Sequence, residues 1–125
     1  MGYWADIDLK KIPDIKVIPP GPKSQEYHKR AGRYMKGYSS QVRLFPVVFE
    51  KGYGYTLTDV DGNTYLDFSS GIYVASLGHC HPKVSEAISK YAKTLMNCHD
   101  FTTPIKTKLL EKLAQITPGD LNGIQ

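Results

Sequence analysis

Alternating apolar and polar residues between positions 47 and 68 predict a three-stranded antiparallel sheet. The first strand is expected at 47–50 and the other two at 55–59 and 65–68. Asp61 and Gly62 separate the last two strands, and this pair favours the positive φ values of a tight two-residue turn. Residues 51–54 are expected to bend the chain into this hairpin.

Apolar residues at helical spacing predict three amphipathic helices. The first is expected at 24–36, where Ser24 can cap it. The clearest covers 82–95, because one apolar stripe faces a row of charged residues and Pro82 suits the first helical position. The third is expected at 104–116. Together with the sheet, these helices predict an α+β fold.

Prolines dominate the chain before the first helix. Because a proline disfavours helix in the residue before it, residues 1–23 are expected to form an extended arm. Such an arm could lie on another surface, including a partner subunit, or form a disordered tail. Both interpretations stay open.

The segment after the hairpin loses its periodic pattern. Residues 69–71 are small, and residues 72–74 form an apolar run typical of backbone that is buried on both sides. Small residues beside apolar ones, directly after a rigid hairpin, suit a loop that lines a ligand pocket. A simple strand-to-helix connection is the alternative.

The charge pattern argues against nucleic-acid and membrane partners. The net charge of the 125 residues is only +4, and the lysines and arginines are spread along the chain. No apolar run reaches the length of a membrane span, and the first residues lack the order of a signal peptide. Cys80 and Cys98 do not make a disulfide framework. These features favour a cytoplasmic, reduced protein.

Histidines and cysteines cluster at two places and raise the possibility of a metal site. Zinc uses such ligands, but three adjacent residues cannot easily present three donors to one tetrahedral ion. A small metal-binding module is therefore the less favoured interpretation, and a turn leading into a helix is the better one. The residues concerned are His79, Cys80, His81, Cys98 and His99.

Three aspartates surround the hairpin, at positions 59, 61 and 67. Turn chemistry and solvent exposure explain them, so none is predicted to be an acid or base catalyst. No G-x-S-x-G turn is present, and the glycines are too scattered to form a phosphate cradle.

The segments DVDGNTYLDF (59–68), SSGI (69–72) and GHCHPKV (78–84) resemble the N-terminal signature of the class-III pyridoxal-phosphate-dependent aminotransferases. That family includes γ-aminobutyrate, acetylornithine and ornithine aminotransferases and some amino-acid racemases. The likeness covers residues 21–119. It implies the N-terminal segment of a fold-type-I transferase, in which 24–101 belong to the small domain and 102–125 lead toward a large cofactor-binding domain absent from this chain.

The resemblance also implies where a substrate would contact the chain. Phe45 is expected at the mouth of the substrate pocket, Ile72 facing the outer part of the amino acid, Gly71 allowing close approach and Tyr73 at the flank. Ornithine aminotransferases carry tyrosine where this chain has Ile72, so the isoleucine resembles the γ-aminobutyrate and acetylornithine branches. A loop is expected to help complete the site of a neighbouring subunit, through Phe101, Thr102 and Thr103.

The implied cofactor is pyridoxal phosphate, held mainly by residues that this chain does not contain. The Schiff-base lysine and the phosphate-binding turn are expected beyond Gln125, so the isolated chain is expected to be inactive and none of its own residues is predicted to be catalytic. The expected partners are amino-acid and 2-oxo-acid substrates, and either a second copy in a homodimer or a complementing C-terminal chain. A racemase of the same family and a non-catalytic subunit of a split enzyme remain alternatives.

Overall fold

The computed structural model has the predicted α+β class. The chain divides into two compact units, Met1–Glu86 and Ala87–Gln125, and each is described by itself. Within the described ranges, every helix is too short or too polar to cross a bilayer. The structure describes residues 6–35, 37, 40–119 and 123.

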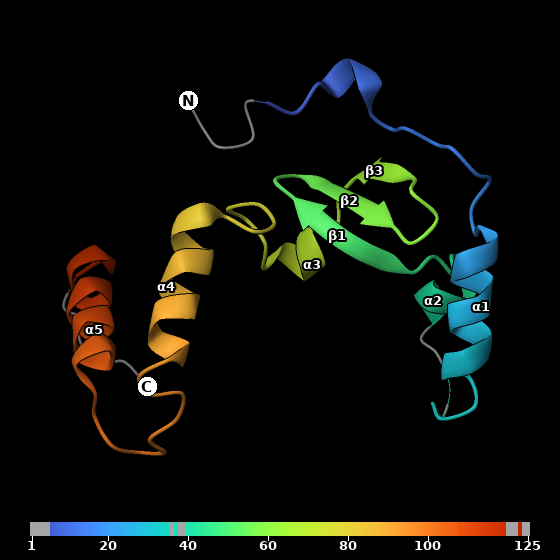
Figure 1. The fold of residues 1–125 in the computed structure, drawn as a ribbon. Helices are drawn as coiled ribbons and strands as arrows, with labels where there is room; N and C mark the ends of the chain where they lie inside the picture. Colours follow the sequence, from blue (N-terminus) through green and yellow to red (C-terminus); the bar gives the residue numbers. More distant parts are fainter. Residues whose placement is uncertain (1–5, 36, 38–39, 120–122, 124–125) are drawn as a thin grey trace. The chain divides into compact units, whose positions relative to one another are not determined.

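The first unit is organised around the predicted three-stranded antiparallel sheet. Its strands are β1 (Phe49–Tyr53), β2 (Thr56–Asp59) and β3 (Thr64–Leu66), in the order β1-β2-β3 (Figure 1). The expected bend at 51–54 is wrong over its first three residues, because β1 continues through them with a register shift after Phe49. Gly54, at a φ of 57°, makes the turn into β2.

The connection between β2 and β3 is longer than the predicted two-residue turn. Four residues, 60–63, separate the two strands. Of the predicted pair only Gly62 has a positive φ, of 90°, and Asp61 does not. The N–H of Asp59 donates to the carbonyl of Asn63 at 2.9 Å and closes the loop.

A buried carboxylate, that of Asp59, lies inside this loop. Its residue is 1% exposed, so the expectation of a solvent-exposed aspartate is wrong here. Its oxygens accept hydrogen bonds from the N–H groups of Asp61 and Asn63, from the side-chain amide of Asn63 and from the Tyr65 hydroxyl, all at 2.8–2.9 Å. Four donors offset the cost of removing this charge from water.

The same surroundings disfavour ionisation of the Tyr65 hydroxyl. Burial, and next the hydrogen bond to Asp59, raise the pKa of Tyr65 to about 12. The hydroxyl therefore stays protonated and serves as a donor to Asp59 at physiological pH.

Asn63 attaches the N-terminal arm to the hairpin. Its side chain is fully buried, and its carbonyl oxygen accepts from the N–H groups of Lys16 and Val17 at 2.7 and 2.8 Å. Asp14 and Thr64 exchange a pair of backbone hydrogen bonds beside it. The arm, which includes the short helix η1 (Leu9–Lys11), thus contacts the hairpin of its own unit.

Helix α1 (Pro22–Ala31) starts against the same loop. Ser24 is not its cap, since Gly21 takes that position without a side-chain hydrogen bond. Instead the Asp61 carboxylate accepts from the N–H groups of Lys23 and Ser24, at 2.8 and 2.9 Å, and from the Ser24 hydroxyl at 2.7 Å. A hairpin residue therefore caps this helix from 37 positions away along the chain.

Two details of α1 follow from this cap. Burial raises the pKa of Asp61, but the hydrogen bonds from Ser24 and Lys23 outweigh it and hold that pKa below its usual value. A Cβ on Gly21 would overlap the Asp61 carboxylate, so glycine is needed there. The helix ends at Ala31, five residues before the predicted end at Lys36, which lies outside the described residues.

The second predicted helix is α4 (Pro82–Ala92), which ends three residues earlier than expected, and the third is α5 (Pro104–Ile116). Thr103 caps α5 by accepting from the N–H of Lys106 at 3.2 Å. Short helices α2 (Ser40–Leu44) and α3 (Ser70–Tyr73) complete the described elements.

Polar side chains dominate the buried positions. Among the described residues, Val47 is the one buried hydrophobic side chain, and many large apolar side chains stay in contact with solvent. Hydrogen bonds around the hairpin therefore order the first unit to an unusual degree. The buried polar residues are Ser24, Thr56, Asp59 and Asn63.

Replacing Asn63 should test this network. Asn63→Ala leaves two arm N–H groups without their acceptor and removes a donor to Asp59, so the free energy of unfolding should fall by about 2–4 kcal/mol. Urea unfolding measures the change. Asn97→Ala is the matched control, because Asn97 is exposed and accepts only a local hydrogen bond, from His99. Equal losses in the two variants would contradict this role.

Candidate functional site

A left-handed turn follows the sheet. The four residues of α3 have φ values of 51° (Ser70), 59° (Gly71), 61° (Ile72) and 64° (Tyr73). Only glycine adopts this conformation without strain, and other residues cost roughly 1–2 kcal/mol each. Backbone strain of this kind clusters at functional sites and persists only where the surroundings enforce it.

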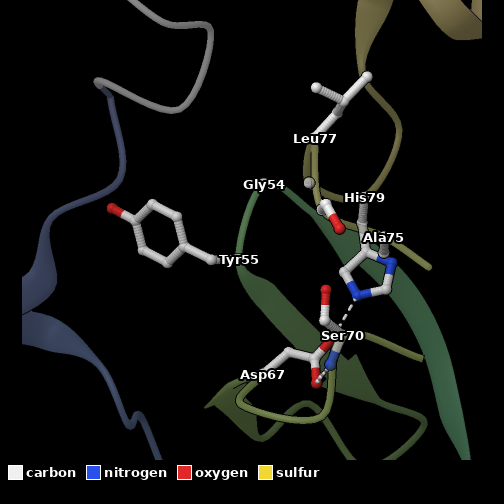
Figure 2. A pocket seen from close by; sticks show the side chains of 9 residues that line it. Gly54, Tyr55, Asp67, Ser70, Ala75, Leu77 and His79 are labelled. Carbon is white, nitrogen blue, oxygen red and sulfur yellow. Dashed lines mark hydrogen bonds and ion pairs between the residues drawn. The ribbon is translucent and has the colours of Figure 1, made fainter. Parts of the chain in front are cut away.

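Asp67 holds the start of this turn. One carboxylate oxygen accepts from the N–H groups of Ser69 and Ser70, both at 2.9 Å. The other lies 2.6 Å from His79 Nε2 (Figure 2). Because a carboxylate can only accept, Nε2 carries the proton of this pair.

The Asp67 carboxylate is largely shielded from solvent. Its side chain is 5% exposed, so the expectation of a solvent-exposed aspartate is wrong for this residue too. Burial raises its pKa, but the hydrogen bonds from His79, Ser70 and Ser69 outweigh that effect. The pKa of Asp67 is therefore held below its usual value.

His79 is itself fixed to the sheet. It exchanges two backbone hydrogen bonds with Gly54, at 2.7 and 3.0 Å. Its ring lies so close to Gly52 that a Cβ there would be 2.8 Å from Cγ of the imidazole. Gly78, at a φ of 89°, forms the predicted turn just before it.

Two hollows adjoin the pair, and Asp67 and His79 line both. The first, here called the Ser70 hollow, has a volume of about 160 Å³ and is also lined by Ser70, Tyr55 and residues 75–78 (Figure 2). The ring of Tyr55 points away from the pair in this view.

The second, here called the Phe45 hollow, has a volume of about 410 Å³ and brings two of the expected substrate-pocket residues together. Phe45 and Gly71 both line it. The rings of Phe45 and Phe49 meet Tyr65 edge to face, with centroids 6.1 and 5.8 Å away. The hollow therefore has an aromatic wall on one side and the left-handed turn on the other.

Ile72 and Tyr73 do not line the Phe45 hollow. Their side chains are 77% and 83% exposed, and that of Val74 is 83% exposed. The expectation that residues 72–74 are buried on both sides is therefore wrong. The turn presents these apolar side chains to the outside of the unit.

The three loop residues expected to serve a neighbouring subunit belong to the second unit. Phe101 is 78% exposed, and its backbone forms hydrogen bonds with Cys98. Thr102 is exposed, and Thr103 caps α5. Thr103 also lines a hollow of about 420 Å³ within this unit, together with Cys98, His99 and Lys108.

The histidines and cysteines of the two clusters were candidates for metal ligands. In the parts of the chain that the structure describes, no three His, Cys, Asp or Glu side chains are placed to hold one ion. His79 instead pairs with Asp67, and Cys80 is exposed.

The sequence pattern around Asp67 indicates its hydrogen bonds to the turn but not its pairing with His79. An aspartate followed two and three residues later by serine N–H groups is a frequent Asx turn. The histidine lies twelve positions further on, and no local pattern links it to that carboxylate.

Comparison with known proteins identifies the family. The family description "Aminotransferase class-III" matches residues 37–124, which is most of the chain. The chain belongs to the class-III aminotransferases. These enzymes depend on pyridoxal phosphate.

Relatives of this class-III chain include two archaeal enzymes. The chain is 33% identical over 118 residues to the alanine/serine racemase of Pyrococcus horikoshii, covering 93% of this chain and 25% of the racemase. It is 47% identical over 89 residues to the acetylornithine aminotransferase of Methanocaldococcus jannaschii, covering 68% of this chain and 22% of that enzyme. The chain spans about a quarter of the length of these relatives.

Solved structures agree with the class-III assignment. The ornithine δ-aminotransferase of Plasmodium falciparum matches with a TM-score of 0.67 and 28% identity, over 74% of this chain and 24% of that one. A transaminase from the marine bacterium Virgibacillus matches with a TM-score of 0.65 and 30% identity, over 78% of this chain and 23% of the other.

The two hollows of the first unit do not fit pyridoxal phosphate on their own. No lysine lines either of them. The Ser70 hollow, at about 160 Å³, is smaller than the roughly 300 Å³ at which ligand pockets begin. The residues that line these two hollows therefore do not make a complete cofactor site.

The lowered pKa of Asp67 predicts how stability depends on pH. A carboxyl group with a depressed folded pKa stabilises the fold fully above its unfolded pKa, near 3.9, and loses that contribution as the pH falls through the lower folded value. Asp67→Asn should therefore reduce the loss of unfolding free energy on acidification from about pH 5. Urea unfolding across this range measures it.

Asp100→Asn is the control for this experiment, since the Asp100 side chain is 94% exposed. It should leave the pH profile close to that of the unchanged chain. A profile that Asp67→Asn does not alter would contradict the role of Asp67.

Proposed function

We propose that this chain forms one wall of the substrate pocket in a pyridoxal-phosphate-dependent aminotransferase. The enzyme moves an amino group from an amino acid of the 4-aminobutyrate or acetylornithine type to a 2-oxo acid. The cofactor supplies the electron sink for this chemistry and is held by residues outside the chain. The single observation that carries the proposal is the Phe45 hollow, where Phe45 and Gly71 meet in a class-III chain.

In this proposal the chain binds and orients the amino acid. Phe45, Phe49 and Tyr65 offer an apolar, aromatic surface to the hydrocarbon part of the substrate. Gly71 has no side chain and lets the substrate approach the backbone of the turn. The Schiff-base lysine is not among this chain's residues.

Ile72 follows Gly71 and lies outside the Phe45 hollow, exposed on the turn, and in this proposal it restricts the part of the substrate that extends beyond the hollow. An apolar side chain cannot satisfy a buried ammonium group, so a free terminal amine is disfavoured there. An acylated amine is neutral and therefore meets a smaller desolvation cost at this wall. The 47% identity to an acetylornithine aminotransferase supports the acylated type.

The second unit serves the site of a neighbouring subunit. Phe101 is a large apolar side chain, 78% exposed, on a loop fixed by the Thr103 cap and the hydrogen bonds to Cys98. Either a second copy in a homodimer or a complementing C-terminal chain would receive it, together with Thr102 and Thr103.

A racemase is the second candidate. The alanine/serine racemase of Pyrococcus horikoshii is 33% identical over 93% of this chain, a longer match than that of the acetylornithine aminotransferase. The two reactions differ in product. Amino transfer from a terminal amine turns the donor into an aldehyde and the 2-oxo acid acceptor into an amino acid, whereas racemisation yields the opposite enantiomer of the same amino acid.

Fusion to the rest of a relative tests the proposed function. The purified chain alone should form no glutamate from 2-oxoglutarate with acetylornithine as the amino donor. Residues 37–119, joined to the remaining sequence of the Methanocaldococcus jannaschii acetylornithine aminotransferase, should restore amino transfer to 2-oxoglutarate, because the chain supplies the missing wall. Product formation is followed by chromatography, and the unaltered relative is the positive control.

A parallel fusion to the remainder of the Pyrococcus horikoshii racemase separates the two candidates. The proposal is supported if the fusion to the aminotransferase transfers amino groups and the fusion to the racemase is inactive. The racemase is favoured if the fusion to the racemase racemises alanine and the fusion to the aminotransferase is inactive. Turnover by the isolated chain would contradict the proposal outright.

Exchanging Ile72 tests the selectivity of the wall. In the active fusion, Ile72→Tyr should raise kcat/KM for ornithine relative to acetylornithine by roughly tenfold to a hundredfold, the effect expected of one hydrogen bond to a charged group. Steady-state kinetics with both donors measures this ratio. The control is Ile18→Tyr, at a residue of the arm that is 87% exposed. Because Ile18 precedes the fused segment, this variant is made in a longer fusion that begins at residue 6, and it should leave the ratio unchanged.

A further inference from the structure

The left-handed turn Ser70–Tyr73 needs a restraint, because three of its four residues carry side chains. Its backbone hydrogen bonds run from the N–H groups of Ile72 and Tyr73 to the Ser69 carbonyl, at 2.9 and 3.2 Å, and from those of Val74 and Ala75 to the Ser70 carbonyl. Such a short closed segment would relax toward ordinary φ values unless its ends were held.

We propose that His79 is a positioning residue that holds this turn in place through Asp67. Its consequence for substrate choice rests on the proposed function. His79 fixes the Asp67 carboxylate, the carboxylate fixes the N–H groups of Ser69 and Ser70, and the turn that follows places Gly71 in the Phe45 hollow.

The carboxylate of Asp67 is divided between two tasks. One oxygen serves the turn and the other serves His79, so the imidazole sets the rotation of the group about its Cβ–Cγ bond. Without His79, the carboxylate could rotate and release one or both of its hydrogen bonds to the turn. Ser69 and Ser70 are therefore coupled to His79 through this carboxylate.

The histidine can act as a restraint because β1 and the turn after it hold it in place. Its backbone pairs with Gly54, and its ring occupies the space that a side chain on Gly52 would need. Contacts thus run without a break from the sheet through His79 and Asp67 to the turn. The ring, with its side chain 24% exposed, needs no contact with substrate for this role.

Hydrogen exchange on the full chain tests the restraint without any enzyme activity. His79→Ala removes the donor to Asp67, and Gly52→Ala displaces the ring while leaving its chemistry unchanged. Both should accelerate exchange of the Ile72 and Tyr73 amides by roughly tenfold to a hundredfold, the range for losing one hydrogen bond to a charged group. His79→Gln, which offers another N–H donor, should recover part of the protection.

Two controls make the result decisive. Gly123→Ala, at a glycine with open space around it, should leave exchange unchanged. The amides of Asp59 and Val60, which bond within the sheet and its loop, should keep their protection in every variant. Unchanged exchange of the turn amides would overturn the proposal. Equal acceleration at Asp59 and Val60 would also overturn it, because His79 would then maintain the whole fold and not this turn.

The link to substrate choice is tested in the active fusion. His79→Ala should raise KM for acetylornithine more than it lowers kcat, and His79→Gln should restore part of the loss, because a misplaced wall weakens binding more than chemistry. An unchanged KM beside accelerated exchange would overturn the link. If the unaltered fusion shows no amino transfer, the proposed function fails while the exchange result on the full chain still decides the restraint.

Discussion

The fold of the first unit depends on the hydrogen bonds that three carboxylates in and beside the hairpin accept. Asp59 organises the loop that carries Asn63, and Asn63 binds the arm. Asp61 caps α1, and Asp67 binds the turn that follows β3. Each of these carboxylates accepts several hydrogen bonds, which offset its lost hydration. The donors to Asp59 lie in or beside its own loop, whereas Asp61 binds the distant start of α1 and Asp67 also binds His79. One short hairpin therefore fixes three neighbouring segments.

This polar arrangement leaves apolar surface for another role. Val47 is the one hydrophobic side chain buried among the described residues, whereas Phe68, Ile72 and Tyr73 are at least 77% exposed. Exposed apolar side chains on a strained, well-anchored turn suit a wall that meets a substrate or another part of an enzyme. The chain belongs to the class-III aminotransferases and spans about a quarter of the length of the relatives compared above, which agrees with such a wall.

Local signals in the sequence predicted the elements but not their connections. Strand alternation located the sheet, and Thr103 before Pro104 located the start of α5. Asp59 resembled an ordinary turn aspartate, since three of its four donors come from the turn itself, and only folding buries it. The pairing of Asp67 with His79 could not be predicted, because it joins residues that no periodic pattern relates. The prediction that Ile72 is buried was wrong, because the residue lies in a left-handed turn and a β-branched residue rarely adopts a positive φ.

The central claim is that hydrogen bonds to Asp59, more than apolar burial, stabilise the first unit. Urea unfolding of two variants compares these contributions directly. Asp59→Asn keeps the shape but removes the charge that four donors share, and Val47→Ala removes apolar contact at the buried hydrophobic position. The account predicts a loss of about 2–4 kcal/mol for Asp59→Asn, exceeding the loss of roughly 1.5 kcal/mol for Val47→Ala. A larger loss for Val47→Ala would contradict it.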